Sequence, residues 1–134
     1  MNRDEAVEYT RRWTDAWNRL DVEAVLEHFD EDVIFSSPKA LAAVGMPTVR
    51  GKGALRDYWM TALQPVKSLR FTLVRVIWDP DASELVIIYD RELDGRVDRA
   101  SEILQFGPGG RVVRGEVFYG VRESLEDARV IAPH

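Results

Sequence analysis

Glu102 is the residue whose position most clearly suggests chemistry. It lies within residues 97–106, a run rich in β-branched and apolar residues that predicts a strand. Because side chains alternate between the two faces of a strand, Glu102 shares a face with Leu104 and Phe106, which we expect to point into the interior. A carboxyl group in an apolar interior costs free energy unless it is protonated or paired, and such groups often mark functional sites. Glu102 is therefore the candidate catalytic acid, base or hydrogen-bond donor, with a pKa raised by desolvation.

A structural role for Glu102 is equally compatible with the sequence. A salt bridge would satisfy the carboxylate without chemistry, and a position on the convex face of the sheet would leave it in water. The arginines that could pair with it are Arg75, Arg91 and Arg99. The sequence leaves these interpretations open.

Aromatic side chains could form the walls of a cavity around this carboxyl group. Trp13 and Trp17 belong to an apolar stripe at helical spacing near the N-terminus, and Trp59 lies on a second such stripe. Tyr119 lies in the last predicted strand. Such stripes serve either a packed core or a ligand cavity, and both uses stay open.

Other chemistry-bearing residues do not form a recognisable set. The sequence has no cysteine, and its two histidines, His28 and His134, have no metal-ligating neighbours in sequence. The glycines at 51–53 and 107–110 lack the spacing of a phosphate-binding loop. Ser37 lacks the flanking glycines of a nucleophile elbow. We therefore predict no metal and no cofactor.

The order of the predicted elements indicates an α+β fold in a single domain spanning residues 1–134. Apolar residues at helical spacing predict three helices, near residues 2–20, 22–29 and 52–63. Residues 33–37 predict a short strand, and residues 39–51 an apolar loop. Four longer strands are predicted at residues 69–78, 85–93, 97–106 and 112–121. The core is expected to cover about residues 5–121, followed by a charged tail at 122–134.

Composition limits the possible partners. The chain has 134 residues, 46% of them hydrophobic and 31% charged, with a net charge of −5. Charges of both signs are interleaved without a basic stripe, so we expect no nucleic-acid binding. We expect no membrane partner, because no apolar run approaches the ~20 residues of a membrane span. The polar N-terminus is not that of a signal peptide, and we expect a cytoplasmic location.

Several local motifs, in this order, resemble the nuclear transport factor 2-like superfamily, in the branch of SnoaL-like proteins and ketosteroid isomerases. They are a second helix capped by Asp21, the strand Asp32-Val33-Ile34-Phe35-Ser36-Ser37-Pro38, the helix start Gly51-Lys52-Gly53-Ala54-Leu55 with Tyr58-Trp59, and a closing hairpin. The resemblance covers about residues 5–121. It implies a cone-shaped, curved antiparallel β-sheet wrapped around three N-terminal helices, a cystatin-like roll with one deep apolar cavity.

The resemblance also indicates where the catalytic groups of relatives would lie. Ketosteroid isomerases carry a proton-shuttling carboxylate before the strand's proline and an oxyanion-facing tyrosine on the first helix, positions that fall on Ser37 and Trp13. The aspartic acid of their third long strand falls on Glu102. The last-strand aspartate of SnoaL-type cyclases falls on Val117. Arg96-Val97-Asp98 matches the arginine-x-aspartate of limonene-epoxide hydrolases, but it lies beside a turn. Glu102 is thus the catalytic position that keeps a carboxyl group.

These observations predict a cavity protein for a small hydrophobic molecule. One interpretation is a cofactor-independent isomerase-, cyclase- or hydrolase-like enzyme, and the other is a non-catalytic ligand-binding or dimeric interaction protein. The loop around Gly45-Met46-Pro47 is expected to cover the mouth of the cavity. The predicted ligand-binding residues are Trp13, Trp17, Phe35, Ser37, Trp59, Leu104, Val117 and Tyr119.

The sequence also predicts a homodimer. Apolar residues are expected in a row across the outer face of adjacent strands, and such rows mark interfaces. The residues concerned are Val74 or Val86, with Ile88, Ile103 and Phe118. The resemblance implies pairing through this same face.

Overall fold

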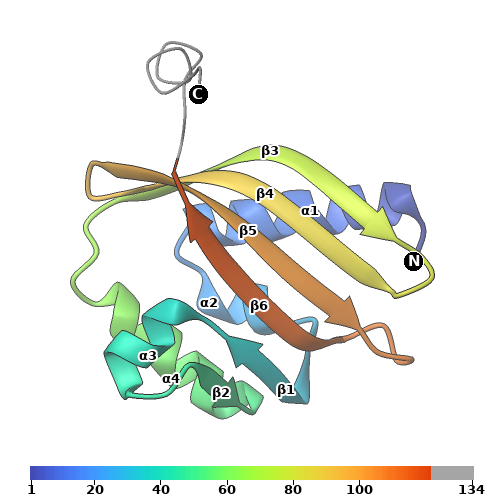
Figure 1. Ribbon diagram of the computed structural model, residues 1–134, viewed down its shortest axis with the longest axis horizontal. Coiled ribbons are helices and arrows are strands. Elements are labelled where there is room, and N and C mark those ends of the chain that lie inside the picture. Colours follow the sequence, from blue (N-terminus) through green and yellow to red (C-terminus); the bar gives the residue numbers. More distant parts are fainter. Residues whose placement is uncertain (122–134) are drawn as a thin grey trace, which may run out of the picture.

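The computed structural model, which describes residues 1–121, confirms the α+β fold (Figure 1). The helices are α1 (Arg3–Asn18), α2 (Val22–Leu26), α3 (Pro38–Val44) and α4 (Lys52–Leu63). The strands are β1 (Phe29–Ser36), β2 (Thr48–Arg50), β3 (Leu69–Asp79), β4 (Glu84–Leu93), β5 (Arg96–Phe106) and β6 (Val112–Gly120). The predicted charged tail at 122–134 lies outside the described residues.

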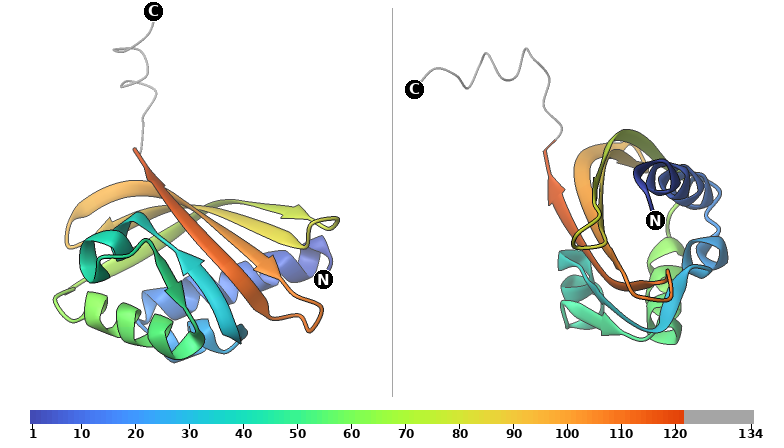
Figure 2. Two further views of the ribbon diagram at one scale, coloured as in Figure 1. Left: turned by 60° about the horizontal axis from the view of Figure 1, so that its bottom comes forward. Right: turned by 90° about the vertical axis from the view of Figure 1, so that its right-hand side faces the viewer.

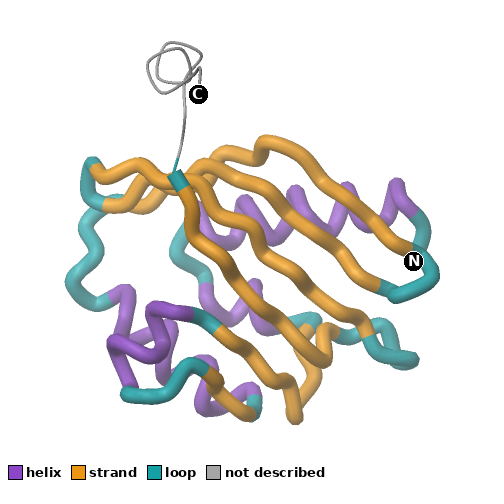
Figure 3. The backbone as a smooth tube through the Cα atoms, in the orientation of Figure 1, coloured by secondary structure: helices purple, strands orange, loops and turns teal. Residues whose placement is uncertain are grey.

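One curved sheet of six strands, in the order β2-β1-β6-β5-β4-β3, forms the frame of the molecule. Strands β3 to β6 form the predicted antiparallel meander, which runs as one continuous surface in Figure 3. The predicted antiparallel order fails at one pair, because β1 pairs with β6 in parallel. A tight turn requires antiparallel neighbours, whereas β1 and β6 are separated by most of the chain and can run in the same direction.

The sheet curls around α1, which lies along its concave side (Figure 2). A capping box starts this helix: Glu5 N–H donates to the Asn2 side chain at 2.8 Å, and Asn2 N–H donates to the Glu5 carboxylate at 3.0 Å. Asp21 caps α2 through a 3.0 Å bond from Ala24 N–H, as the sequence predicts. Helix α1 packs against β3, while α4 packs against β1 and α2.

The predicted loop at residues 39–51 is wrong, because much of it is regular. Residues 38–44 form α3, whose N-cap Ser37 accepts a 3.1 Å hydrogen bond from Lys39 N–H. Pro38 occupies the first helical turn, where its missing N–H costs nothing. Gly45 ends the helix with a φ of 78°. Residues 48–50 then form β2 against β1. The protein therefore has four helices in its described part rather than three.

The second helix and the first long strand also differ from the prediction. Helix α2 ends at Leu26, and β1 begins at Phe29, four residues before the expected start. The acidic run at residues 30–32 hides the strand pattern, and the pairing of β1 with β6 is irregular between Phe29 and Ile34. Phe29 itself is fully buried and pairs with Val112.

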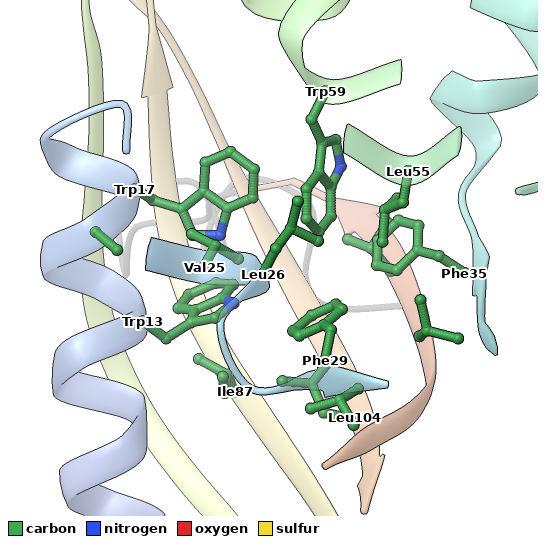
Figure 4. Packing of buried hydrophobic residues seen from close by; sticks show 14 of the residues in the cluster. Trp13, Trp17, Val25, Leu26, Phe29, Phe35, Leu55, Trp59, Ile87 and Leu104 are labelled. Carbon is green, nitrogen blue, oxygen red and sulfur yellow. The ribbon is translucent and has the colours of Figure 1, made fainter. Parts of the chain in front are cut away.

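Aromatic residues from α1, α4 and β1 dominate the core (Figure 4). The Trp59 ring makes edge contacts with Trp17 at 4.9 Å, Phe35 at 5.3 Å and Phe29 at 5.9 Å between ring centroids. Such geometry adds about 0.5–1.5 kcal/mol per pair beyond the area that is buried. Trp59 thus connects α4 to both α1 and β1.

Gly115 of β6 gives Phe35 the room it needs. A Cβ atom at this position would lie 2.7 Å from Phe35 Cδ2 and 3.3 Å from Leu104 Cδ2. Both neighbours are buried, so neither ring nor side chain can move away freely.

We expect Gly115→Ala to destabilise the fold by about 1–3 kcal/mol, since it overpacks a filled core. Chemical denaturation followed by tryptophan fluorescence measures the change in free energy of unfolding. Gly109→Ala is the matched control, because a Cβ there meets no atom within 4 Å. Equal stability of the two variants would contradict this assignment.

Candidate functional site

A cavity of about 260 Å³ lies between the concave face of the sheet and helices α1, α3 and α4. Seven of the predicted ligand-binding residues line it together with Glu102: Trp13, Trp17, Phe35, Ser37, Trp59, Val117 and Tyr119. Residues from distant parts of the sequence therefore meet around one space.

Leu104 does not line this cavity. Its side chain is fully buried and lies beside Phe29 in the core (Figure 4). The alternation that places Leu104 and Glu102 on one face is correct, but the two positions lie at different depths along β5. Leu104 pairs with Gly115 in the packed part of the sheet, whereas Glu102 lines the cavity.

The loop around Gly45-Met46-Pro47, predicted to cover the cavity, lies elsewhere. Lys39 and Ala43 of α3 line the cavity, whereas residues 45–47 do not. Met46 is 62% exposed and borders a separate groove between α3 and α4. The difference follows from the helical turn at residues 38–44, which turns Lys39 and Ala43 inward and carries Met46 away from the cavity.

Glu102 is buried at the side of the cavity and interacts with a tyrosine. Only 4% of its surface is exposed, and the Tyr89 hydroxyl donates a hydrogen bond of 3.1 Å to Glu102 Oε1. In the sheet, Glu102 pairs directly with Ile87 of β4. Tyr89, two residues further along β4, therefore lies diagonally across from Glu102.

The predicted salt bridges of Glu102 do not form. Within residues 1–121, no arginine or lysine nitrogen lies within 4.0 Å of its carboxyl oxygens. Arg91 pairs with Asp98, Arg99 pairs with Asp90, and Arg75 is exposed. The convex-face alternative is wrong as well, since Glu102 lines the cavity.

Burial raises the pKa of Glu102 to about 8, against smaller opposing effects of the Tyr89 hydrogen bond and the Arg91 charge. At pH 7 roughly nine-tenths of the molecules then carry the proton. The carboxyl group can donate a hydrogen bond in this form and accept a proton in the other. Few side chains can do both near neutral pH.

The charge of Glu102 affects four tyrosines. Burial raises the pKa values of Tyr9, Tyr89 and Tyr119 well above the ordinary value, and the nearby Glu102 charge adds to the effect. Tyr58 lines the same cavity, and its pKa is raised by partial burial. All four hydroxyls stay protonated at neutral pH and can act as hydrogen-bond donors.

Two cations lie at the ring of Tyr119, and neither was singled out as a cavity residue from the sequence. The Arg91 guanidinium carbon lies 4.5 Å from the ring centroid and Lys39 Nζ lies 4.6 Å from it. Asp98 holds Arg91 through two hydrogen bonds of 3.0 and 2.9 Å. Alternation from Ile87 and Tyr89 would have placed Arg91 on the inner face of β4. Nothing in the sequence marks Lys39, because it depends on the unexpected helix α3.

Ser37 and the tryptophans of α1 line the cavity with few accessible polar atoms. Ser37 is buried, with 4% of its surface exposed, and its hydroxyl caps α3. The indole Nε1 atoms of Trp13 and Trp17 are buried without a hydrogen-bond partner among the described residues. Neither nitrogen is exposed to the cavity, so the tryptophans present apolar ring surface to it.

The comparisons with known proteins agree with this architecture. A family model, the SnoaL-like domain, matches residues 10–123. The chain belongs to the SnoaL-like family.

Solved structures of similar fold extend this result. A SnoaL-like protein of unknown function from Burkholderia thailandensis is 30% identical, with a TM-score of 0.81 over 89% of this chain and 97% of that one. TerC, co-crystallised with polyporic acid, is 16% identical, with a TM-score of 0.71 over 86% of this chain and 91% of that one. A proposed polyketide cyclase from Sinorhizobium meliloti is 16% identical, with a TM-score of 0.66 over 83% and 94%. No match to a curated protein was found.

The described residues contain no metal-binding cluster and no helix that could span a membrane. No three side chains of His, Cys, Asp or Glu in residues 1–121 gather where they could hold a metal ion. No helix in this part of the chain has the length and apolar character needed to cross a membrane.

The raised pKa of Glu102 predicts a pH-dependent stability. The folded state keeps a proton that an unfolded chain releases near pH 4.5, so this stabilisation is fully present below that value and is lost as the pH rises through 8. Between pH 5 and 8 the native protein should lose about 3 kcal/mol through this group. In Glu102→Gln this part of the pH dependence should vanish.

Thermal and urea unfolding at pH 5, 6, 7 and 8 measure this difference. Glu116→Gln, at an exposed position of β6, is the matched control and should keep the native pH profile. A uniform loss of stability in Glu102→Gln at every pH would instead indicate a structural carboxylate.

Proposed function

We propose that this SnoaL-like protein is a cofactor-independent enzyme that moves a proton on a small hydrophobic carbonyl compound, with Glu102 as the acid and base. The observation that carries the proposal is a buried carboxyl group with a pKa of about 8, hydrogen-bonded by Tyr89 and facing an aromatic cavity. Isomerase-, cyclase- and hydrolase-like reactions all use such a group, and an isomerisation is the simplest of them.

A proton shift can be completed with the groups of this cavity. Ionised Glu102 takes a proton from the carbon beside the carbonyl group, and the C–H electrons move into the carbonyl to give an enolate. The same proton is then returned to a second carbon of the conjugated system, which restores the carbonyl and the carboxylate. The Tyr119 hydroxyl is a donor that could stabilise the enolate oxygen.

The aromatic walls and the fold relatives support a ligand cavity. Three tryptophans line the space around Glu102, which suits a flat apolar molecule. A protein of the same fold was co-crystallised with polyporic acid, and another is a proposed polyketide cyclase. These two relatives are too distant in sequence to indicate the substrate.

We expect the protein to convert 3-cyclohexen-1-one, a minimal β,γ-unsaturated ketone, into its conjugated isomer. Because the ionised form of Glu102 starts the reaction, the rate should rise with pH and level off above pH 8. Glu102→Gln should lower the rate at least ~100-fold. Ultraviolet absorbance of the conjugated product measures the reaction, and Glu116→Gln should retain native activity.

Tyr89→Phe gives a second readout. The Tyr89 hydrogen bond lowers the pKa of Glu102, so its removal should move the inflection of the pH–rate profile to higher pH. Tyr9→Phe is the control, since Tyr9 does not line the cavity and makes no hydrogen bond to Glu102, and its ring contacts His28 and Phe106. An unchanged profile in Tyr89→Phe would contradict the role of Glu102 as the titrating group.

A non-catalytic ligand-binding protein is the second candidate. Ser37 and Val117 replace the carboxylates that relatives use, and Ser37 is engaged as a helix cap. Tight binding of small ketones with no proton exchange in deuterated solvent, measured by NMR, would favour this alternative.

We also propose that the protein forms a homodimer through the outer face of its sheet. Val74 and Phe118 expose 42% and 48% of their surfaces there, and Val86, Ile88 and Ile103 are partly exposed on the same face. A second copy would cover these apolar side chains.

Light scattering at micromolar concentration should give about twice the chain mass of 15.3 kDa. Phe118→Glu should yield a monomer, because it buries a charge in the contact. Met60→Glu is the control, since Met60 is 54% exposed on α4, away from the sheet face. A monomeric native protein would contradict this proposal.

A further inference from the structure

The mouth of the Glu102 cavity holds more positive than negative charge. Lys39 and Arg91 both line the cavity and both contact the Tyr119 ring. Arg91 is neutralised by Asp98 through two hydrogen bonds. Lys39 has no such partner, because no carboxylate oxygen of residues 1–121 lies within 4.0 Å of its Nζ.

The surroundings of Lys39 disfavour its charge, although the side chain is exposed. Partial burial lowers the pKa of Lys39, and the charges of Arg91 and Arg96 lower it further, against a smaller opposing effect of Asp98. Two like charges on one aromatic ring repel each other, although each gains from the ring itself. An anion placed between them would relieve this repulsion.

The interior of the cavity adds no negative charge at neutral pH. Glu102 is the single carboxyl group that lines it within the described residues, and this group is mostly protonated. Lys39, Arg91 and Asp98 therefore leave an excess of one positive charge at the mouth, next to walls of tryptophan and phenylalanine.

We infer that the ligand is an amphiphilic organic anion, a flat apolar body that carries a carboxylate or an acidic enolate. The anionic group lies between Lys39 and Arg91, and the body contacts Trp13, Trp17 and Trp59. This inference rests on the proposed function only in assuming that the cavity takes small molecules, and it does not require turnover.

The test compares two ligands that differ in charge and have nearly the same shape, 2-naphthoate and 2-naphthamide. Isothermal titration calorimetry at pH 7 and low salt measures both affinities. We expect the anion to bind about tenfold or more tightly than the amide, and this preference should shrink as salt is added.

Lys39→Gln tests the assigned cation. Lys39 is exposed on its outer side, so the variant should fold normally, as a thermal melt verifies. It should lose most of the preference for 2-naphthoate and keep its affinity for 2-naphthamide. Lys67→Gln, at an exposed position before β3, is the matched control and should behave as the native protein.

Variants of Tyr119 provide an independent check. Tyr119→Phe keeps the ring that holds both cations, and it should retain the preference for the anion. Tyr119→Leu removes the ring and should weaken the preference severalfold.

The outcomes separate this inference from the proposed function. Equal affinities for the two ligands, or an undiminished preference in Lys39→Gln, would overturn the anion site and leave the proposed enzyme intact. Failure of both ligands to bind the native protein at millimolar concentration would overturn the anion site and also count against a small-molecule cavity.

Discussion

The edge contact between Trp17 and Trp59 is the interaction on which the cavity depends. It joins α1 to α4 at a centroid distance of 4.9 Å, while Phe35 attaches the same Trp59 ring to β1. These large flat side chains hold the helices apart as well as together, because they cannot collapse onto the concave sheet as smaller residues would. The space next to Glu102 thus follows from these aromatic contacts of Trp59 with Trp17 and Phe35. The gap that Gly115 leaves for Phe35 belongs to the same arrangement.

The shape of the cavity determines which of the groups that face it are charged. Glu102 cannot be solvated from outside, so its charge is disfavoured and the Tyr89 hydroxyl is its polar contact. At the mouth of the cavity, Arg91 is stabilised by Asp98 and by the Tyr119 ring. The cavity therefore combines a neutral acid at its wall with positive charge at its entrance. In the proposed complex this polarity orients the ligand, with its anionic end toward the mouth and its apolar end against the tryptophans.

Departures from the family pattern are concentrated on one side of this cavity. Ser37 and Val117, where relatives carry acids, leave Glu102 without a second carboxyl group inside. Two carboxyl groups in one apolar space would compete for a single proton and shift each other's pKa. A single group titrates alone, which explains why burial dominates the behaviour of Glu102. In this protein Lys39 from α3 and Arg91 from β4, rather than a second acid, are the other charged groups that line the cavity.

Sequence alone determined the meander of β3 to β6 and the caps of α1 and α2, whereas the face that Glu102 occupies stayed open until the structure placed it at the cavity. The first two follow from local periodicity or from a cap within a few residues of the element it starts. Tertiary structure decided the parallel pairing of β1 with β6, because no local turn relates these strands. It also decided that Glu102 meets Tyr89 rather than an arginine, since that contact depends on the register of β4 and β5. Helix α3 was missed because its seven residues are too few for a periodic signal, and with it the place of Lys39. Leu104 and Glu102 share a face by alternation, and only the tertiary packing separates a fully buried position from one that lines the cavity.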